Sequence, residues 1–306
     1  MRHKNTVFHS ILANVPWGVF DRLVADHQAD KHVRKLSTKT QFTAILYGQF
    51  SGATTLRALV SSFGSHVQRL YHLGVSAVAR SSLSDANAHR PVAVFSGLFA
   101  ALVARAHPKL AREIKECVLR LDSTTCPLNG LSRDWAQFSA GVCGVKTHVV
   151  YDPNADCPLF AAITPQRVND ITAAKAMPIQ PGATYVFDLG YYDYGWWAEL
   201  DAAGCRIVTR FKSNTPLTVE TERLIEPGAV ATASATVLSD RTGYLPARQA
   251  NNRHNPMKRL VREVTVRIET GRILRLLTND LTASATEIAD LYKRRWAIEL
   301  FFRWVK

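Results

Sequence analysis

Between residues 117 and 211 the sequence alternates short apolar runs with segments of helical periodicity. The strand-like runs occupy residues 117–122, 145–151, 159–163, 184–188 and 205–211. Helical patterns cover residues 170–177 and 194–203. Three strands in succession favour an antiparallel meander, whereas strands separated by helices favour a mixed sheet. This alternation predicts an α/β core.

The first 110 or so residues have a helical pattern instead. Ser37 is placed to cap a helix that runs to Phe50, and the Ser51-Gly52 pair indicates a turn. A second helical pattern covers residues 53–63. Two short helices joined by a glycine-containing turn fit a helix-turn-helix, but a plain helical hairpin that packs its own core explains this pattern better. A further helix is expected over 84–106, with Pro91 as a kink or a later start.

The second half of the chain changes pattern twice. Residues 213–278 read as mostly β, and residues 284–306 predict one strong helix, with Ser284 as its cap and Glu287 at the capping-box position. We therefore expect a helical N-terminal domain, two parts of one α/β core separated by a β-rich insertion, and a last helix that completes the core. The corresponding ranges are 1–80, 81–212, 213–278 and 279–306.

The net charge of the chain indicates which class of partner it binds. Lys and Arg number 38 against 25 Asp and Glu, which gives a net charge of +13 and favours a polyanion. A membrane partner is disfavoured because the chain has no apolar run of about 18 residues. The five cysteines include no CxxC pair, which argues against a disulfide framework and a zinc ribbon. Composition thus predicts a cytoplasmic protein that binds nucleic acid.

Carboxylates stand at two strand ends and on the last helix. Asp122 and Asp188 each end an apolar run, and two such residues in one sheet favour a site for a hard divalent cation. On a helical wheel, Tyr292, Arg295, Glu299 and Lys306 share an arc of about 60° on an otherwise largely apolar helix. A solvated stripe with an Arg295–Glu299 ion pair and a functional site explain that arc equally well.

The spacing Tyr-x2-Arg-x3-Glu-x6-Lys resembles the YREK signature of bacterial DDE transposases of the insertion-sequence "four" family. The segment Leu121-Asp122-Ser123 is similar to the first Asp motif of that family, and Asp188-Leu189-Gly190-Tyr191 is similar to the second. Leu189 departs from the Arg that is common in the second motif. The β-rich stretch and the helical N-terminal region also resemble parts of these transposases. The resemblance therefore implies that residues 1–80 form a DNA-binding domain and that the helix in residues 279–306 is the catalytic helix.

The resemblance implies a ribonuclease-H-like core in which Asp122, Asp188 and Glu299 converge on two Mg²⁺ ions, with Mn²⁺ as a substitute. It also implies metal-dependent cut-and-paste transposition, in which the strands at the insertion-sequence ends are cut and transferred to a target. Tyr292, Arg295 and Lys306 would then hold phosphates. The partners implied are double-stranded DNA, as terminal inverted repeats and target, and a second copy of the chain on that DNA. The bacterial nucleoid is the expected place of action.

Two other readings stay open. Related transposases continue past the signature helix, and this sequence stops at Lys306. The chain is therefore also compatible with a truncated, inactive DNA-binding derivative. A stand-alone metal-dependent nuclease of the same fold is the third reading.

Several other residues invite a functional reading. Arg253, Lys258 and Arg259 belong to the densest basic stretch of the insertion, where a solvated loop and a phosphate contact are equally good explanations. His148 is better explained as an ordinary strand residue than as a site residue. Trp196 and Trp197 fit a helix core better than base stacking.

Overall fold

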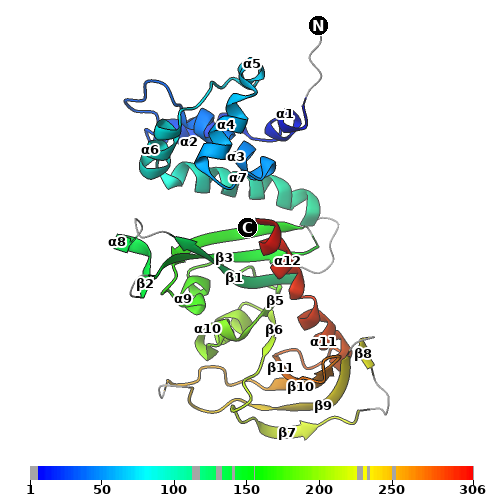
Figure 1. Cartoon of the computed structure of the whole chain (residues 1–306). Helices are drawn as coiled ribbons and strands as arrows, with labels where there is room; N and C mark the ends of the chain where they lie inside the picture. The colour runs from blue at the N-terminus through cyan, green and yellow to red at the C-terminus, as the bar shows by residue number, and fades with distance from the viewer. Residues whose placement is uncertain are drawn as a thin grey trace. The chain divides into compact units, whose positions relative to one another are not determined.

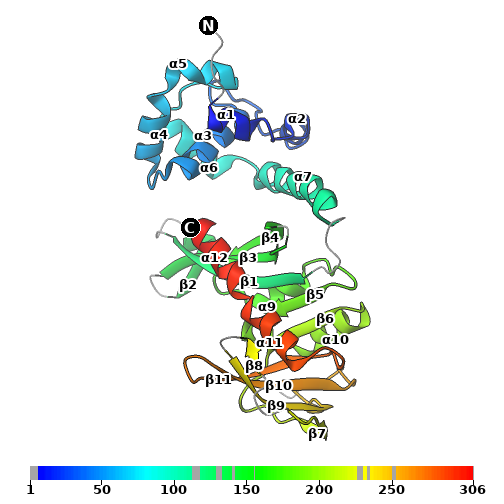
Figure 2. The ribbon, with the colours of Figure 1, turned by 90° about the vertical axis from the view of Figure 1, so that its right-hand side faces the viewer.

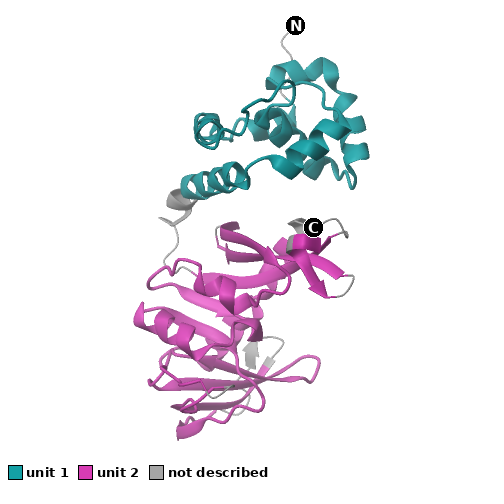
Figure 3. Ribbon diagram, turned by 90° about the vertical axis from the view of Figure 1, so that its left-hand side faces the viewer, with its two compact units in different colours: residues 1–106 teal, residues 107–306 magenta. Residues whose placement is uncertain are grey.

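The computed structural model describes residues 6–111, 118–128, 133–139, 142–154, 156–225, 230–232, 235–249 and 253–305 (Figure 1). The chain divides into two compact units, Met1–Ala106 and His107–Lys306 (Figure 3). The first unit thus includes residues 81–106, which were expected to belong to the core. The described helices include none that is long and apolar enough to cross a membrane.

The first unit is helical, as expected. Its elements are α1 (Val7–Leu12), α2 (Trp17–Asp26), α3 (Thr38–Ser51), α4 (Leu56–Gly64), α5 (Val67–Leu70), the 3-10 turn η1 (Tyr71–Leu73), α6 (Arg80–His89) and α7 (Val92–Ala111). The Ser37 hydroxyl caps α3 by accepting from the Thr40 amide, and Gly52 ends α3 with φ of 68°. The predicted pair of helices is therefore confirmed. The expected helical segment over 84–106 is interrupted at Pro91, as predicted, and forms the end of α6 and most of α7.

Close packing joins α3 to α4. A Cβ added at Gly48 would lie 2.5 Å from Leu59 Cδ1, so a side chain there would require the Leu59 side chain or the helix to shift. Leu59, Phe63 and Leu83 form the centre of one buried cluster, and Phe20 and Leu98 belong to a second. The helical unit therefore has its own apolar core.

The second unit is built on a mixed sheet. Its first part contains β1 (Val118–Leu128), β2 (Gln137–Ser139), β3 (Val142–Asp152), β4 (Cys157–Pro165), β5 (Thr184–Phe187) and β6 (Arg206–Arg210). The short helices α8 (Arg133–Ala136), α9 (Asp170–Lys175) and α10 (Tyr194–Ala202) connect these strands, with the 3-10 turn η3 (Leu189–Tyr191) after β5. Strands β4, β3 and β1 are antiparallel neighbours, and β5 and β6 follow β1 in parallel. This is the expected ribonuclease-H-like arrangement.

The β-rich stretch extends the same sheet. It forms β7 (Thr218–Glu222), β8 (Val230–Thr232), β9 (Ala235–Tyr244), β10 (Val261–Ile268) and β11 (Ile273–Thr278). Because β11 pairs with β6, the described strands make one eleven-stranded sheet. On one face of the core, Trp196 and Trp197 of α10 are buried against Phe187 and Tyr191. The prediction that these tryptophans belong to the core is thus confirmed.

The last helix is two helices, which corrects the prediction of one unbroken helix over 284–306. Helix α11 (Ala285–Lys293) is capped by Ser284 as predicted, and α12 (Trp296–Val305) follows after a break. Shorter hydrogen-bonded turns replace the α pattern there, with the Ala297 amide donating to the Arg294 carbonyl at 3.0 Å. Figure 2 shows α11 beside β10 and α12 across β1 and β3. The break lets each helix bury its own apolar face on a different part of the sheet.

Candidate active site

Strand register brings Asp122 and Asp188 to the same level of the sheet. Strand β1 pairs in parallel with β5, and Val118 lies opposite Thr184. Asp122 and Asp188 each lie four residues beyond that pair, Asp122 on β1 and Asp188 directly after β5, whose paired segments are about 4.8 Å apart. Asp188 directly follows β5, where its Oδ1 accepts from the Gly190 amide at 2.8 Å. The sheet alone therefore places two carboxylates side by side.

Arg295 connects the third carboxylate to the first. Its Nη1 lies 3.2 Å from Asp122 Oδ2, and its Nη2 lies 2.6 Å from Glu299 Oε1. Glu299 belongs to α12, which packs on β3 through the buried side chains of Ile298 and Phe302. One guanidinium thus spans two carboxylates that are 177 positions apart in the sequence numbering.

The electrostatics agree with that grouping. Burial above all, together with the negative charges of Asp188 and Glu299, raises the pKa of Asp122 to about 6. The Ser123 amide and the Arg295 guanidinium act in the opposite direction by favouring the carboxylate. The carboxylates of Asp122 and Glu299 are therefore stabilised by a nearby positive charge, and Arg295 supplies it.

Three carboxylates are a fitting donor set for a hard divalent cation, because Mg²⁺ and Mn²⁺ prefer anionic oxygen ligands. In the part of the chain that the structure describes, no three His, Cys, Asp or Glu side chains are close enough together to hold a metal ion. Arg295 lies between Asp122 and Glu299 instead. Sharing an ion among all three carboxylates therefore requires this side chain to move.

The other two residues of the Tyr-Arg-Glu-Lys spacing are Tyr292 and Lys306. Tyr292 is buried near the end of α11, and the Arg295 guanidinium carbon is 5.9 Å from its ring centre. Burial raises the pKa of Tyr292, and the positive charges of Arg295 and Arg210 oppose that rise. Lys306 lies outside the described residues.

Comparison with known proteins identifies the domain. Residues 113–306 match the family described as the transposase DDE domain. The chain belongs to this family. Residues 3–76 match a family described as a domain of unknown function (DUF4372).

Two relatives and one solved structure extend the comparison of this DDE-family chain. The putative transposase y4zB of Sinorhizobium fredii is 43% identical over 225 residues, which are 73% of this chain and 61% of that relative, so the match spans about three fifths of the relative's length. The probable transposase for insertion sequence element IS5377 of Geobacillus stearothermophilus is 27% identical over 280 residues, or 86% of this chain and 71% of the relative. A piggyBac transposase synaptic complex with hairpin DNA matches with a TM-score of 0.47 and 10% identity, over 99% of this chain and 69% of that one.

The DDE-family chain has a fourth acidic residue at this site, Asp170, which was not predicted from the sequence. Its Oδ1 accepts from the Ser123 hydroxyl at 2.9 Å and lies 3.2 Å from Lys146 Nζ. The buried His148 ring has its Nδ1 3.6 Å from the same oxygen, and burial lowers the pKa of that imidazole. Asp170 is therefore bonded to the residue that follows Asp122 and to strand β3.

Asp170 also faces Asp188. A Cβ added at Gly190 would lie 2.9 Å from Asp170 Oδ2 and 3.1 Å from Asp188 Oδ1, so a larger residue would require the carboxylates to shift. The Tyr191 hydroxyl is buried and has no hydrogen-bond partner among the described residues. Burial and the charges of Asp170, Asp122 and Asp188 all raise its pKa. The signal for Asp170 was an acid in the first turn of an expected helix, and this signal alone did not distinguish it from a capping residue.

The basic stretch that was predicted to contact DNA lies beside α10. Arg253 forms an ion pair with Asp193 at 3.0 Å, and Arg259 forms one with Asp201 at 3.2 Å, so both arginines lie against α10 and the residue that caps it. Lys258 is exposed. The two arginines thus have carboxylate partners within the chain, and their contact with DNA stays a prediction.

Proposed function

We propose that this protein is a DDE transposase that cuts and joins DNA at insertion-sequence ends, with Asp122, Asp188 and Glu299 as its catalytic carboxylates. The observation that carries the proposal is the shared level of Asp122 and Asp188 on neighbouring parallel strands, with Glu299 linked to Asp122 through Arg295. The relatives' names and the family match support the same reading. The finer assignment to the "four" family rests on the YREK spacing.

The three carboxylates would hold two Mg²⁺ or Mn²⁺ ions. Such ions activate a water or a DNA 3′-hydroxyl and stabilise the leaving oxygen of an in-line phosphoryl displacement. The carboxylates must be deprotonated to serve as ligands, and the raised pKa of Asp122 means that binding a cation competes with binding a proton.

Arg295 has two roles in this proposal. It neutralises Asp122 and Glu299 in the metal-free protein, and its planar fork suits a phosphate once it leaves them. Tyr292 supports the guanidinium with its ring face, and Lys306 would add a further cation near the DNA. The partners are then duplex DNA and a second copy of the chain, which together bring two ends into one complex on the bacterial chromosome.

The test is cleavage of a duplex that carries the element's own terminal repeat, in Mg²⁺ or Mn²⁺. We expect the wild-type chain to nick the repeat boundary and Glu299→Gln to reduce the rate at least about 10³-fold, because a ligand of the reacting ions is removed. Glu287→Gln on the neighbouring helix α11 is the matched control and should cleave normally. Binding without cleavage by the wild-type chain would contradict the proposal and favour an inactive DNA-binding derivative.

A further inference from the structure

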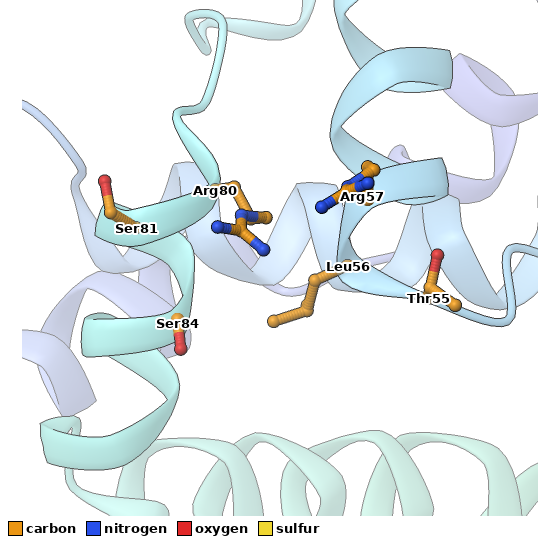
Figure 4. A pocket seen from close by; sticks show the side chains of 6 residues that line it. All are labelled: Thr55, Leu56, Arg57, Arg80, Ser81 and Ser84. Carbon is orange, nitrogen blue, oxygen red and sulfur yellow. The ribbon is translucent and has the colours of Figure 1, made fainter.

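A groove opens between α4 and α6 in the helical unit. Its volume is about 620 Å³ (Figure 4). Six residues line it: Thr55, Leu56, Arg57, Arg80, Ser81 and Ser84. Arg57 from α4 and Arg80 from α6 reach into the space between the two helices from opposite sides, with Leu56 between them (Figure 4). The lining therefore combines two guanidinium groups with three hydroxyl groups and contains no carboxylate.

The two arginines lack counter-charges. Among the described residues, neither Arg57 nor Arg80 forms an ion pair or a side-chain hydrogen bond, and both are exposed. The one acidic residue of α6, Asp85, lies 3.1 Å from His89 of the same helix. Two like charges that face a common groove repel each other unless an anion lies between them.

Some of the other basic residues of this unit have structural partners. Arg90 donates to the carbonyl oxygens of Ala29 and Leu36, and Lys39 lies 4.8 Å from the centre of the Trp17 ring. These cations hold the unit together. The groove arginines make no such contact with the described part of the chain, so their positions suit an external ligand.

The backbone at the start of α6 adds donors to the groove. Helix α6 begins at Arg80, and Ala79 at its cap offers no side-chain acceptor to the first amides. Amides in the first turn of a helix favour anions. In α4, by contrast, the Thr55 hydroxyl already accepts from the Ala58 amide at 3.1 Å.

The charge of the whole unit identifies the class of anion. Residues 1–106 contain twelve Lys and Arg against four Asp and no Glu, whereas residues 107–306 contain 26 against 21. An open groove on so basic a unit suits an extended polyanion better than a small metabolite.

We propose that the α4–α6 groove binds the phosphodiester backbone of duplex DNA through Arg57 and Arg80. This deepens the proposed function, on which it rests for the identity of the polyanion, and it gives a role to a region that matches a domain of unknown function. The contacts are to phosphates, so they position the DNA without reading its sequence.

The test measures binding of the full chain to a 30-base-pair duplex without metal, in EDTA, over a range of salt concentrations. We expect Arg57→Ala with Arg80→Ala to weaken binding about tenfold or more. The slope of log affinity against log salt should fall by about 2, because each arginine that is removed leaves one phosphate without its cation. The affinity should fall equally for the terminal repeat and for a scrambled duplex.

The matched control is Arg22→Ala with Arg69→Ala, which removes the same charge from exposed positions of the same unit outside the groove. It should change the affinity less than about threefold. Arg57→Lys with Arg80→Lys should keep most of the salt slope, because the charges remain. Circular dichroism checks that all variants fold.

Three results would each overturn the proposal. The groove variant and the control variant could weaken binding equally, the groove variant could bind as well as the wild-type chain, or the wild-type chain could fail to bind DNA. The outcome is separate from that of the cleavage test. If the chain binds DNA through the groove but never cleaves it, only the proposed transposase activity is contradicted. If the chain cleaves DNA and the two groove substitutions leave binding unchanged, only the groove proposal is contradicted.

Discussion

The two units of this protein use their charges in opposite ways. In the α/β unit, several arginines are paired with carboxylates, as in the buried pair of Arg262 and Asp240 at 2.7 Å and the pair of Arg275 and Glu263 at 2.7 Å. In the helical unit, acids are few, and the groove arginines face solvent. Paired charges fix a structure, whereas unpaired charges of one sign attract a ligand. This contrast agrees with the two proposals made above, that the α/β unit carries the chemistry and that the helical unit binds DNA.

The largest effect on stability is expected at Asp240. Its two oxygens accept from Arg262 Nε and Nη2, each at 2.7 Å, and both side chains are buried. Asp240→Ala leaves an uncompensated buried guanidinium, so we expect the free energy of unfolding to fall by about 3–5 kcal/mol. Chemical denaturation of the wild-type chain and the variant measures this change in the free energy of unfolding.

The control for that variant comes from the helical unit. Asp85→Ala removes the partner of His89 on the exposed face of α6, where both side chains are more than three-quarters exposed. Exposed pairs contribute about 0–1 kcal/mol. If both variants were destabilised equally, the contrast between the buried ion pair of the α/β unit and the exposed pair of the helical unit would fail.

A smaller effect, this time on catalysis, is expected at Asp170. Asp170→Asn weakens its bonds to Ser123 and Lys146 without removing a proposed metal ligand. We expect a fall in cleavage rate of about 10- to 100-fold, as for outer partners of metal ligands. DNA binding in EDTA should not change. A parallel fall in DNA affinity would instead mean that Asp170 supports the DNA surface and does not position the carboxylates.

Much of this site could be predicted from local patterns. The apolar runs that end at Asp122 and Asp188 are strands, and the capping signals of Ser37 and Ser284 mark real helix starts. The helical wheel also placed Arg295 beside Glu299, because residues four apart share a face even across the break before α12.

What the sequence did not show depends on contacts between distant elements. The helix breaks at Arg294 because α11 and α12 pack on two different parts of the sheet, and a helical wheel drawn from the sequence cannot show this. Asp170 becomes a site residue only when α9 meets β1 and β3, and Gly190 is constrained only because two carboxylates meet over it. The pairing of β11 with β6, which merges the insertion with the core, is likewise set by tertiary structure.

The most direct test of the central claim is Mn²⁺ binding to the metal-free protein, followed by electron paramagnetic resonance. Asp188→Asn is the informative variant, because it removes a proposed ligand and leaves the ion pairs of Arg295 with Asp122 and Glu299 in place. Asp290→Asn, which removes the partner of Arg294 on α11, is the control. The account predicts that the wild-type chain and the control bind Mn²⁺ and that Asp188→Asn binds it at least about tenfold more weakly. No binding by the wild-type chain, or equal binding by both variants, would contradict it.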